Sequence, residues 1–150
     1  MSTDNLRRIH FPLPSDYPFA GESVQAEWMG EDSYKLRNIP FFASAVHDVN
    51  LGDVVLARGK ESGELPEFLS IEERSGSESF SLFLHLEEGA DRGLADYAAL
   101  LEELDLSVEG GFGILLAVDI PADTDDSVSV QLQRLLERWE ERGVLSASDE

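Results

Sequence analysis

The chain has 150 residues, 42% of them hydrophobic, and its 31 acidic and 11 basic side chains give a formal net charge of −20. This length suffices for one sizeable core or for two small units that share an interface. The acidic balance argues against nucleic-acid binding through phosphates, because neutralising phosphates requires clustered lysine and arginine.

Cysteine and long apolar runs are both missing from the sequence. Without cysteine there are no disulfides, thiol nucleophiles or Cys-ligated zinc sites, which fits a reducing compartment. There is neither an apolar run of about 18 residues nor a basic leader followed by an apolar stretch. We therefore expect a soluble cytoplasmic protein that makes no use of a membrane.

The first half of the chain is predicted to be rich in short strands. Period-two alternation of apolar and polar residues marks strands at residues 7–13, 22–29, 34–39, 53–58 and 67–74. Pro12 and Pro14 make the first of these an edge strand at best. The second and third form a hairpin across the polar turn at residues 30–33. These strands predict a small, bent antiparallel sheet or an SH3-sized barrel.

The third strand ends in an apolar segment that contains a proline. Ile39, Phe41 and Phe42 surround Pro40, which has no N–H to donate to a ladder. Such a run is too apolar for an exposed loop, so we expect it to enter the core, followed by one helical turn or an irregular crossover over residues 43–50. The large aromatic residues predicted to be core residues are Trp28, Phe41, Phe42 and Trp139.

The second half changes to a mixed pattern. A strand at 80–86 precedes a helix that starts near Asp91, and a short strand at 106–108 precedes a Gly110–Gly111 turn and a buried strand at 114–120. Asp123–Asp126 then caps a second helix that ends at Gly143, and residues 144–146 form a last short strand. This order is typical of a split β-α-β, ferredoxin-like unit.

Together these patterns predict an α+β protein. Residues 6–78 form the strand-rich N-terminal subdomain and residues 79–146 the ferredoxin-like subdomain, with flexible ends at 1–5 and 147–150.

Three segments of the strand-rich half also resemble a known family. Glu22 to Trp28, Tyr34 to Phe42 with its Asn-Ile-Pro-Phe core, and Gly52 to Val55 with its Gly-Asp-Val-Val sequence resemble the prokaryotic domain of unknown function family number 4265. The similar layout extends to about Ile120. The family name carries no activity, so the resemblance implies no catalytic residues and no ligand.

Several groups invite a chemical interpretation. The cluster of Asp119, Asp123, Asp125 and Asp126 lacks the glycine and glutamate of a calcium loop, and capping of a helix explains it better. His47–Asp48 is the one neighbouring histidine–carboxylate pair, but no nucleophile is marked beside it. Gly110–Gly113 precedes a strand rather than the helix that a phosphate loop requires. We therefore expect no metal, no cofactor and no assembled catalytic set.

The acidic residues are concentrated in the second half. Residues 1–75 contain 13 acids and 7 bases, whereas residues 76–150 contain 18 acids and 4 bases. Such a field attracts a basic partner. The simpler explanation is adaptation to a high-salt cytoplasm, with only two lysines in the chain. The candidate acidic patch consists of Glu87, Glu88, Asp91, Glu102, Glu103 and Glu109.

Two classes of function stay open from the sequence. The favoured one is a non-catalytic binding protein for a basic partner, acting as an inhibitor, an immunity-type protein or a regulator. The alternative is a small cofactor-free enzyme or ligand binder that uses a cleft between the two subdomains, with candidate residues Arg37, Asn38, His47, Asp48 and Asp53. The biological process, partner and oligomeric state are not encoded in any of these patterns.

Overall fold

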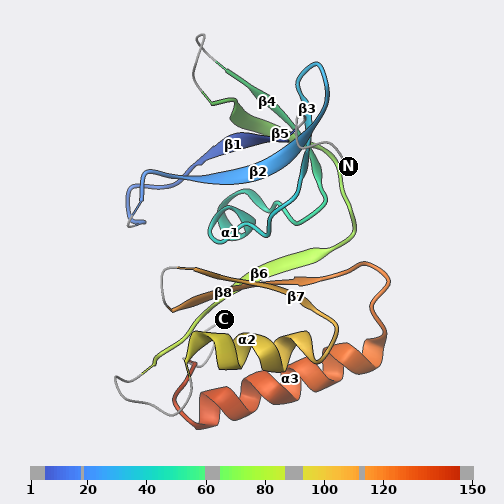
Figure 1. Ribbon diagram of the computed structural model, residues 1–150. Coiled ribbons are helices and arrows are strands. Elements are labelled where there is room, and N and C mark those ends of the chain that lie inside the picture. Colours follow the sequence, from blue (N-terminus) through green and yellow to red (C-terminus); the bar gives the residue numbers. More distant parts are fainter. Residues whose placement is uncertain (1–5, 18, 60–64, 87–92, 112–113, 146–150) are drawn as a thin grey trace.

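The structure is a computed structural model that describes residues 6–17, 19–59, 65–86, 93–111 and 114–145. The protein is α+β and consists of two stacked units (Figure 1). The strand-rich unit contains the N-terminal half, and a three-stranded sheet with two helices contains the C-terminal half. The predicted order of a strand-rich region followed by a mixed one is confirmed.

The first unit is a closed barrel. Its strands are β1 (Leu6–Pro12), β2 (Gly21–Gly30), β3 (Ser33–Leu36), β4 (Val54–Arg58) and β5 (Glu67–Glu73). Consecutive strands pair antiparallel, and the barrel closes where His10 of β1 pairs in parallel with Glu67 of β5. The prediction that β1 is at best an edge strand is wrong, because β1 has a partner on each side. Pro12 is the last residue of its ladder, so its missing N–H interrupts nothing.

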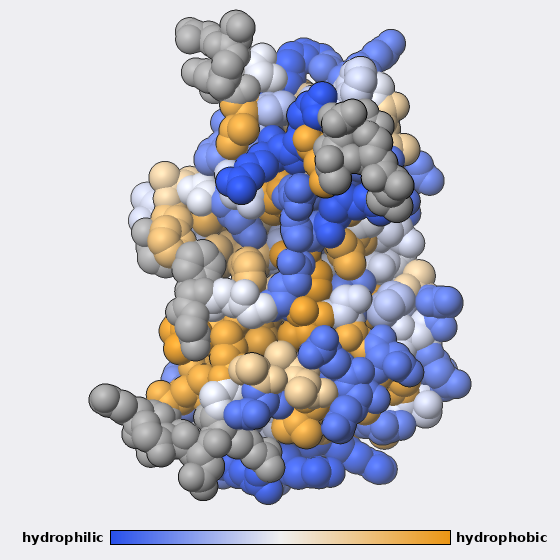
Figure 2. Space-filling model, in the orientation of Figure 1, coloured by the Kyte–Doolittle hydropathy of each residue, from blue (hydrophilic) through white to orange (hydrophobic). Residues whose placement is uncertain are grey.

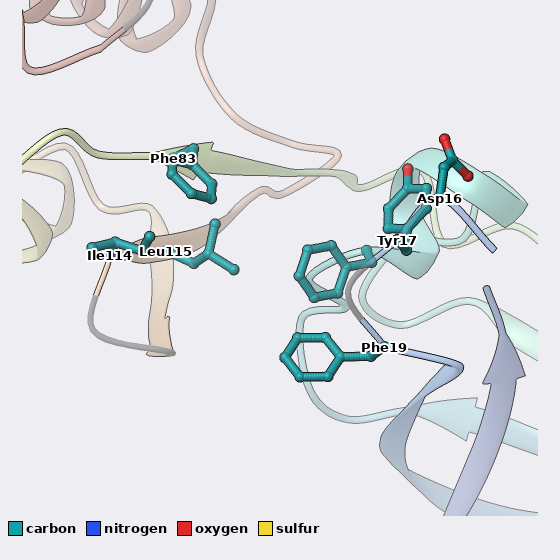
Figure 3. A pocket seen from close by; sticks show the side chains of 7 residues that line it. Asp16, Tyr17, Phe19, Phe83, Ile114 and Leu115 are labelled. Carbon is teal, nitrogen blue, oxygen red and sulfur yellow. The ribbon is translucent and has the colours of Figure 1, made fainter. Parts of the chain in front are cut away.

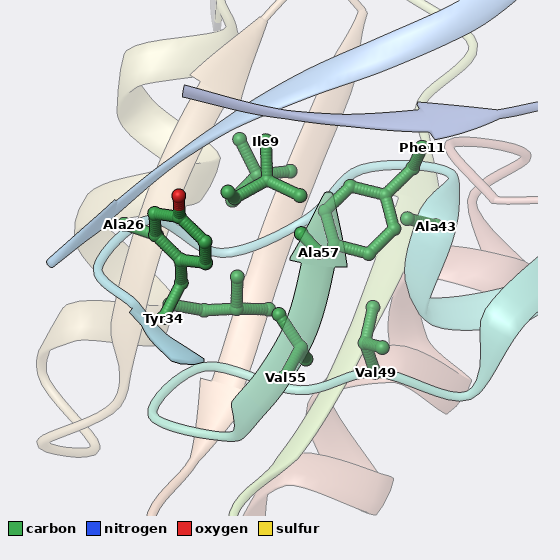
Figure 4. Packing of buried hydrophobic residues seen from close by; sticks show 10 residues of the cluster. Ile9, Phe11, Ala26, Tyr34, Ala43, Val49, Val55 and Ala57 are labelled. Carbon is green, nitrogen blue, oxygen red and sulfur yellow. The ribbon is translucent and has the colours of Figure 1, made fainter. Parts of the chain in front are cut away.

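Alternate residues of the barrel strands fill its interior. The buried cluster comprises Ile9, Phe11, Val24, Ala26, Tyr34, Leu36, Val55 and Ala57 (Figure 4). The short helix α1 (Ala43–His47) adds Ala43, and the segment after it adds Val49. Of the apolar run around Pro40, Ile39 is buried as predicted, whereas Phe41 and Phe42 are only partly buried.

Trp28 departs from the prediction that it is a core residue. It is 41% exposed. The pairing of β2 with β3 shifts register between Trp28 and Gly30, and the indole Nε1 donates a hydrogen bond to the carbonyl of Glu31 at 2.8 Å. The ring therefore stabilises the hairpin turn instead of the core.

The barrel, the sheet of the second unit and the two helices of that unit form three successive layers. Its sheet contains β6 (Glu78–Phe83), β8 (Leu115–Ile120) and β7 (Ser107–Gly111) in that spatial order, with β8 antiparallel to both neighbours. The helices α2 (Leu94–Glu102) and α3 (Asp126–Glu141) cover the face turned away from the barrel (Figure 1). Five residues of β8 are buried, as the continuous apolar run predicted.

The ends of the two long helices follow capping rules. Asp125 accepts a hydrogen bond from the Ser127 N–H at 2.9 Å, which lowers the pKa of its carboxyl by favouring the charged form. Gly143 after α3 has φ of 76°, as a predicted C-terminal glycine requires. At the start of α2 the N-cap is Gly93. The predicted cap, Asp91, lies outside the described residues.

Two further expectations need correction. Gly110 and Gly111 belong to β7 and pair with β8, so they do not form the predicted turn. The described part of the last predicted strand, residues 144–145, has no strand assignment. Val144 instead accepts one backbone hydrogen bond, from His85 at 2.7 Å.

Candidate functional site

The Asn-Ile-Pro-Phe segment lies at the junction of the two units and is held there by a carboxylate. Glu22 of β2 accepts hydrogen bonds from the backbone N–H groups of Phe41 at 2.6 Å, Phe42 at 2.8 Å and Ala43 at 2.8 Å. N–H groups at the start of a helix have no partners within the helix. The Glu22 carboxylate satisfies them, and it fixes the chain direction after Pro40.

The second unit binds the same segment from the other side. Glu109 of β7 accepts the Ile39 N–H at 2.5 Å and the Asn38 side-chain Nδ2 at 3.0 Å. The Ser81 hydroxyl on β6 donates to the carbonyl of Phe41 at 2.5 Å. The backbone near Pro40 is therefore satisfied by side chains from both units. The side-chain amide of Asn38 donates to the same carboxylate as the Ile39 N–H and not to a backbone carbonyl.

A polar network forms a second connection between the units. Ser79 of β6 donates its hydroxyl to Asp119 at 2.7 Å, accepts the Leu51 N–H at 2.9 Å, and donates its own N–H to Asn50 Oδ1 at 2.8 Å. Burial raises the pKa of the Asp119 carboxyl; hydrogen bonds from Ser79 and Ser77 oppose this, and the charge of Asp53 adds to it. Asp119 thus belongs to the junction and not to a surface metal site.

Between the two units lies an open, mainly apolar groove. It has a volume of about 540 Å³ and is lined by Asp16, Tyr17, Phe19, Phe42, Phe83, Ile114 and Leu115. Tyr17 and Phe19 lie on the barrel side of the groove, across from Phe83 and Leu115 on the sheet (Figure 3). Phe42 also lines the groove. The rings of Tyr17 and Phe42 meet edge to face at 5.7 Å between centroids. We name this the junction groove.

The junction groove continues into a second hollow of about 350 Å³ beside α1. The two share Tyr17, Phe42, Phe83 and Leu115. In the space-filling view, hydrophobic residues gather at and just below the level of the junction (Figure 2). Phe19 is 42% exposed and Phe83 is 55% exposed, so large aromatic surface faces solvent here.

The five candidate cleft residues do not converge on this groove. Each of them instead contacts a separate partner within the fold. Arg37 forms an ion pair with Glu27, Asn38 binds Glu109, His47 Nε2 lies 2.7 Å from the Pro12 carbonyl, Asp48 pairs with Arg74 at 3.0 Å, and Asp53 accepts the N–H groups of Asn50 and Ser75. Asp53 is completely buried. Their contacts within the fold account for all five residues.

The six residues of the candidate acidic patch are likewise divided. Glu87, Glu88 and Asp91 lie outside the described residues. Glu102 and Glu103 are exposed at the end of α2, whereas Glu109 is partly buried and binds the Asn-Ile-Pro-Phe segment. Within the described ranges, no group of three or more His, Asp or Glu side chains is arranged to hold a metal ion.

Sequence reasoning missed the aromatic residues of the junction groove. Tyr17 and Phe19 stand in the connection between β1 and β2, for which the sequence predicts neither a strand nor a helix. Phe83 lies on the barrel-facing side of β6 and lines the groove. The signal available was the pair of aromatic residues in a connection that no strand or helix pattern buries. Among the described helices, none is long and apolar enough to cross a membrane.

Comparisons with known proteins identify a family and a fold. The family described as "Domain of unknown function (DUF4265)" matches residues 22–147. A solved structure described as "Novel crystal structure of a hypothetical protein from Neisseria gonorrhoeae" is similar, with a TM-score of 0.68 and 20% sequence identity over 97% of this chain and 93% of that one. At this identity the likeness concerns the fold alone. No curated protein matches the sequence.

Proposed function

Because the chain belongs to the DUF4265 family, whose description names no activity, we propose its function from the junction itself. The protein is a non-catalytic binding module, and its junction groove receives an apolar side chain of a basic protein partner.

The exposed aromatic surface of the groove is the observation that carries this proposal. Phe19 and Phe83 stand on opposite sides of the opening, and each keeps about half of its surface in contact with solvent. Leaving apolar surface exposed in a concave patch is unfavourable in water unless a partner covers it. Buried aromatic contacts contribute strongly at protein interfaces. The groove therefore suits an aromatic or large aliphatic anchor.

Charge supports a basic partner. The chain carries a formal net charge of −20, and Asp16 is the charged residue among the described residues that line the junction groove. A strongly acidic protein accelerates association with a cation and repels acidic competitors. A lysine or arginine next to the apolar anchor would meet the Asp16 carboxylate at the rim.

The groove volume also fits a second function, the binding of a small apolar molecule. About 540 Å³ falls within the usual range of small-molecule sites, roughly 300 to 1,000 Å³. Among the described residues, the lining offers one carboxylate and one phenol but no histidine, serine or lysine, so it supports binding more than acid–base or nucleophilic catalysis.

A pair of charge-reversed peptides tests the proposal. Calorimetry would compare a short lysine peptide that carries one phenylalanine with the same peptide built on glutamate. We expect the lysine peptide to bind at least about tenfold more tightly, and Phe19→Ala and Asp16→Asn each to weaken that binding by about tenfold. Leu69→Ala, at an exposed residue of β5, is the matched control and should have no effect.

Equal binding of the two peptides would contradict a basic partner. If indole, an uncharged aromatic probe, bound the groove as tightly as the lysine peptide, the small-molecule function would be favoured instead.

We also infer that the second unit has the split β-α-β, ferredoxin-like arrangement. This is supported by the order β6-β8-β7, in which β8 lies between two strands that α2 connects, and by α3, which follows β8. In the complete arrangement a fourth strand after the second helix would lie beside β6.

A further inference from the structure

We infer that the outer edge of β6 receives an extended, basic segment of the partner as an added strand. This rests on the proposed function and specifies how the partner is recognised. Main-chain hydrogen bonds to an exposed sheet edge are a recurring mode of peptide recognition.

The directions of the β6 backbone groups define this edge. Leu84 donates its N–H toward β8, to Ile114 at 2.8 Å. Ser79 and His85 donate theirs away from β8, to Asn50 Oδ1 at 2.8 Å and to the Val144 carbonyl at 2.7 Å. N–H directions alternate along a strand, and the β6–β8 pairing has no register shift.

Ser81 and Phe83 therefore direct their N–H groups outward, between the two positions that are already bonded. β6 is the end strand of its sheet, so these groups meet no neighbouring strand in the part of the chain that the structure describes. Within the described residues, this stretch of edge is bounded by Asn50 at one end and Val144 at the other, which fixes where an added strand would pair.

A groove runs along β6 on its α3 side. One part, of about 420 Å³, includes Phe80 and Leu132, and a second part, of about 380 Å³, includes Leu82 and Leu145. Leu136 lines both parts. Side chains of a strand point alternately to its two faces. Every second side chain of an added strand would enter this groove, and the side chains between them would face the junction groove. Phe83 lines both grooves.

Charge selects the occupant. Glu78, Glu137 and Glu140 line the groove along β6, and the described residues of this lining include neither lysine nor arginine. Two copies of this chain could pair through the same edge, but each brings a formal net charge of −20. A segment that alternates apolar and basic residues matches both the apolar floor and the acidic rim.

Backbone methylation provides the first test. Nuclear magnetic resonance of the full-length ¹⁵N-labelled protein would follow a short peptide of alternating valine and lysine, and the same peptide with every second backbone nitrogen methylated. We expect the first peptide to shift the Ser81 and Phe83 amides and slow their hydrogen exchange. The methylated peptide should bind at least about tenfold more weakly, because it cannot complete a ladder.

A matched pair of variants tests the edge itself. Ser81→Pro removes the outward N–H, and proline is tolerated on an edge strand where that N–H faces away from the sheet. Ser81→Ala keeps the N–H and loses only the hydroxyl bond to Phe41. Peptide affinity should fall at least about tenfold in Ser81→Pro and stay within about twofold of the parent in Ser81→Ala. If Ser81→Pro does not fold, the methylated peptide remains decisive.

The possible outcomes separate this inference from the proposed function. If the methylated peptide binds as well as the parent peptide, strand addition is overturned while binding of a basic partner stands. If no lysine peptide binds, both fail. A dimer in sedimentation that the valine–lysine peptide does not dissociate would assign the edge to a second copy. Amides of Ser81 and Phe83 that lose protection only when residues 146–150 are removed would assign it to the chain's own end.

Discussion

The ring of Phe41 lies against the backbone of Gly111, where a Cβ would stand 2.7 Å from the ring Cζ. Phe41 belongs to the Asn-Ile-Pro-Phe segment of the barrel unit, and Gly111 belongs to β7 of the sheet. The glycine lets a side chain from one unit approach the backbone of the other. The ring is partly buried, so the prediction of a core residue holds only in part for Phe41.

Replacing this glycine should therefore weaken the junction. We expect Gly111→Ala to lower the free energy of unfolding by about 1 to 3 kcal/mol, the usual cost of overpacking. Combining it with Phe41→Leu should cost less than the sum of the two single changes, because the smaller side chain leaves room for the new methyl group. Chemical denaturation measures all three variants. Losses that simply add in the double variant would argue against the contact.

Glu109 is expected to matter for folding more than for surface charge. Glu109→Ala leaves the Ile39 N–H without its acceptor, and an unpaired group at this junction costs about 1 to 3 kcal/mol. Glu103→Ala, at an exposed position after α2, should change the free energy of unfolding by less than about 0.5 kcal/mol. Urea denaturation of both variants provides the comparison. Equal changes in the free energy of unfolding in the two variants would indicate that Glu109 acts only as part of the acidic surface.

The buried carboxyl of Asp119 predicts a dependence of stability on pH. Burial raises its pKa, so the folded protein holds this proton more tightly than the unfolded chain does. The free energy of unfolding should therefore decrease as pH rises from the ordinary carboxyl range through the raised pKa of Asp119. Asp119→Asn removes this titration and keeps an oxygen to accept from Ser79.

Denaturation curves over a pH series, with the exposed Asp123→Asn as control, measure the effect. Between the ordinary carboxyl range and the raised pKa, the slope should be flatter in Asp119→Asn than in the parent and unchanged in the control. Parallel slopes in all three proteins would refute the assignment.

The overall charge predicts stabilisation by salt. Raising ionic strength from 0.01 M to 1 M shortens the Debye length from about 30 Å to about 3 Å, which weakens repulsion among carboxylates. Melting temperature should rise across this series. Glu102 and Glu103 lie at the C-terminal end of α2, where the helix dipole also disfavours negative charge, so changing both to glutamine should reduce the salt effect.

The same change at Glu72 and Glu73 of the barrel is the comparison for the salt series. A larger effect at Glu102 and Glu103 favours a concentrated acidic surface. Equal effects at the two sites favour adaptation to high salt.

Local periodicity explains how much of this fold the sequence could predict. The alternation in β2 to β5, the continuous apolar run of β8 and the capping aspartate of α3 are each encoded within a few neighbouring residues. Those elements appear where expected. Barrel closure through His10 and Glu67 and the strand assignment of Gly110–Gly111 depend on segments far apart in the chain. No local period encodes such contacts.

The candidate site was harder to predict for the same reason. The polar residues near Pro40 were predicted as candidate cleft residues. Their actual partners, such as Glu109 for Asn38 and Arg74 for Asp48, are far away in the sequence. The junction groove arises only when Tyr17 and Phe19 meet Phe83 across the two units. The sequence shows that these residues are aromatic, but it does not show that they meet in the fold.

Side chains of both units hold the Asn-Ile-Pro-Phe segment, so the two halves of the chain should bind each other even without a covalent connection. A protease cut between β5 and β6 would sever the covalent connection but not the bonds that Glu109 and Ser81 make to that segment. The nicked protein should stay associated, and the two fragments produced separately should recover their structure on mixing. The molecule is thus suited to use as a split reporter, whose signal returns when two tethered fragments meet.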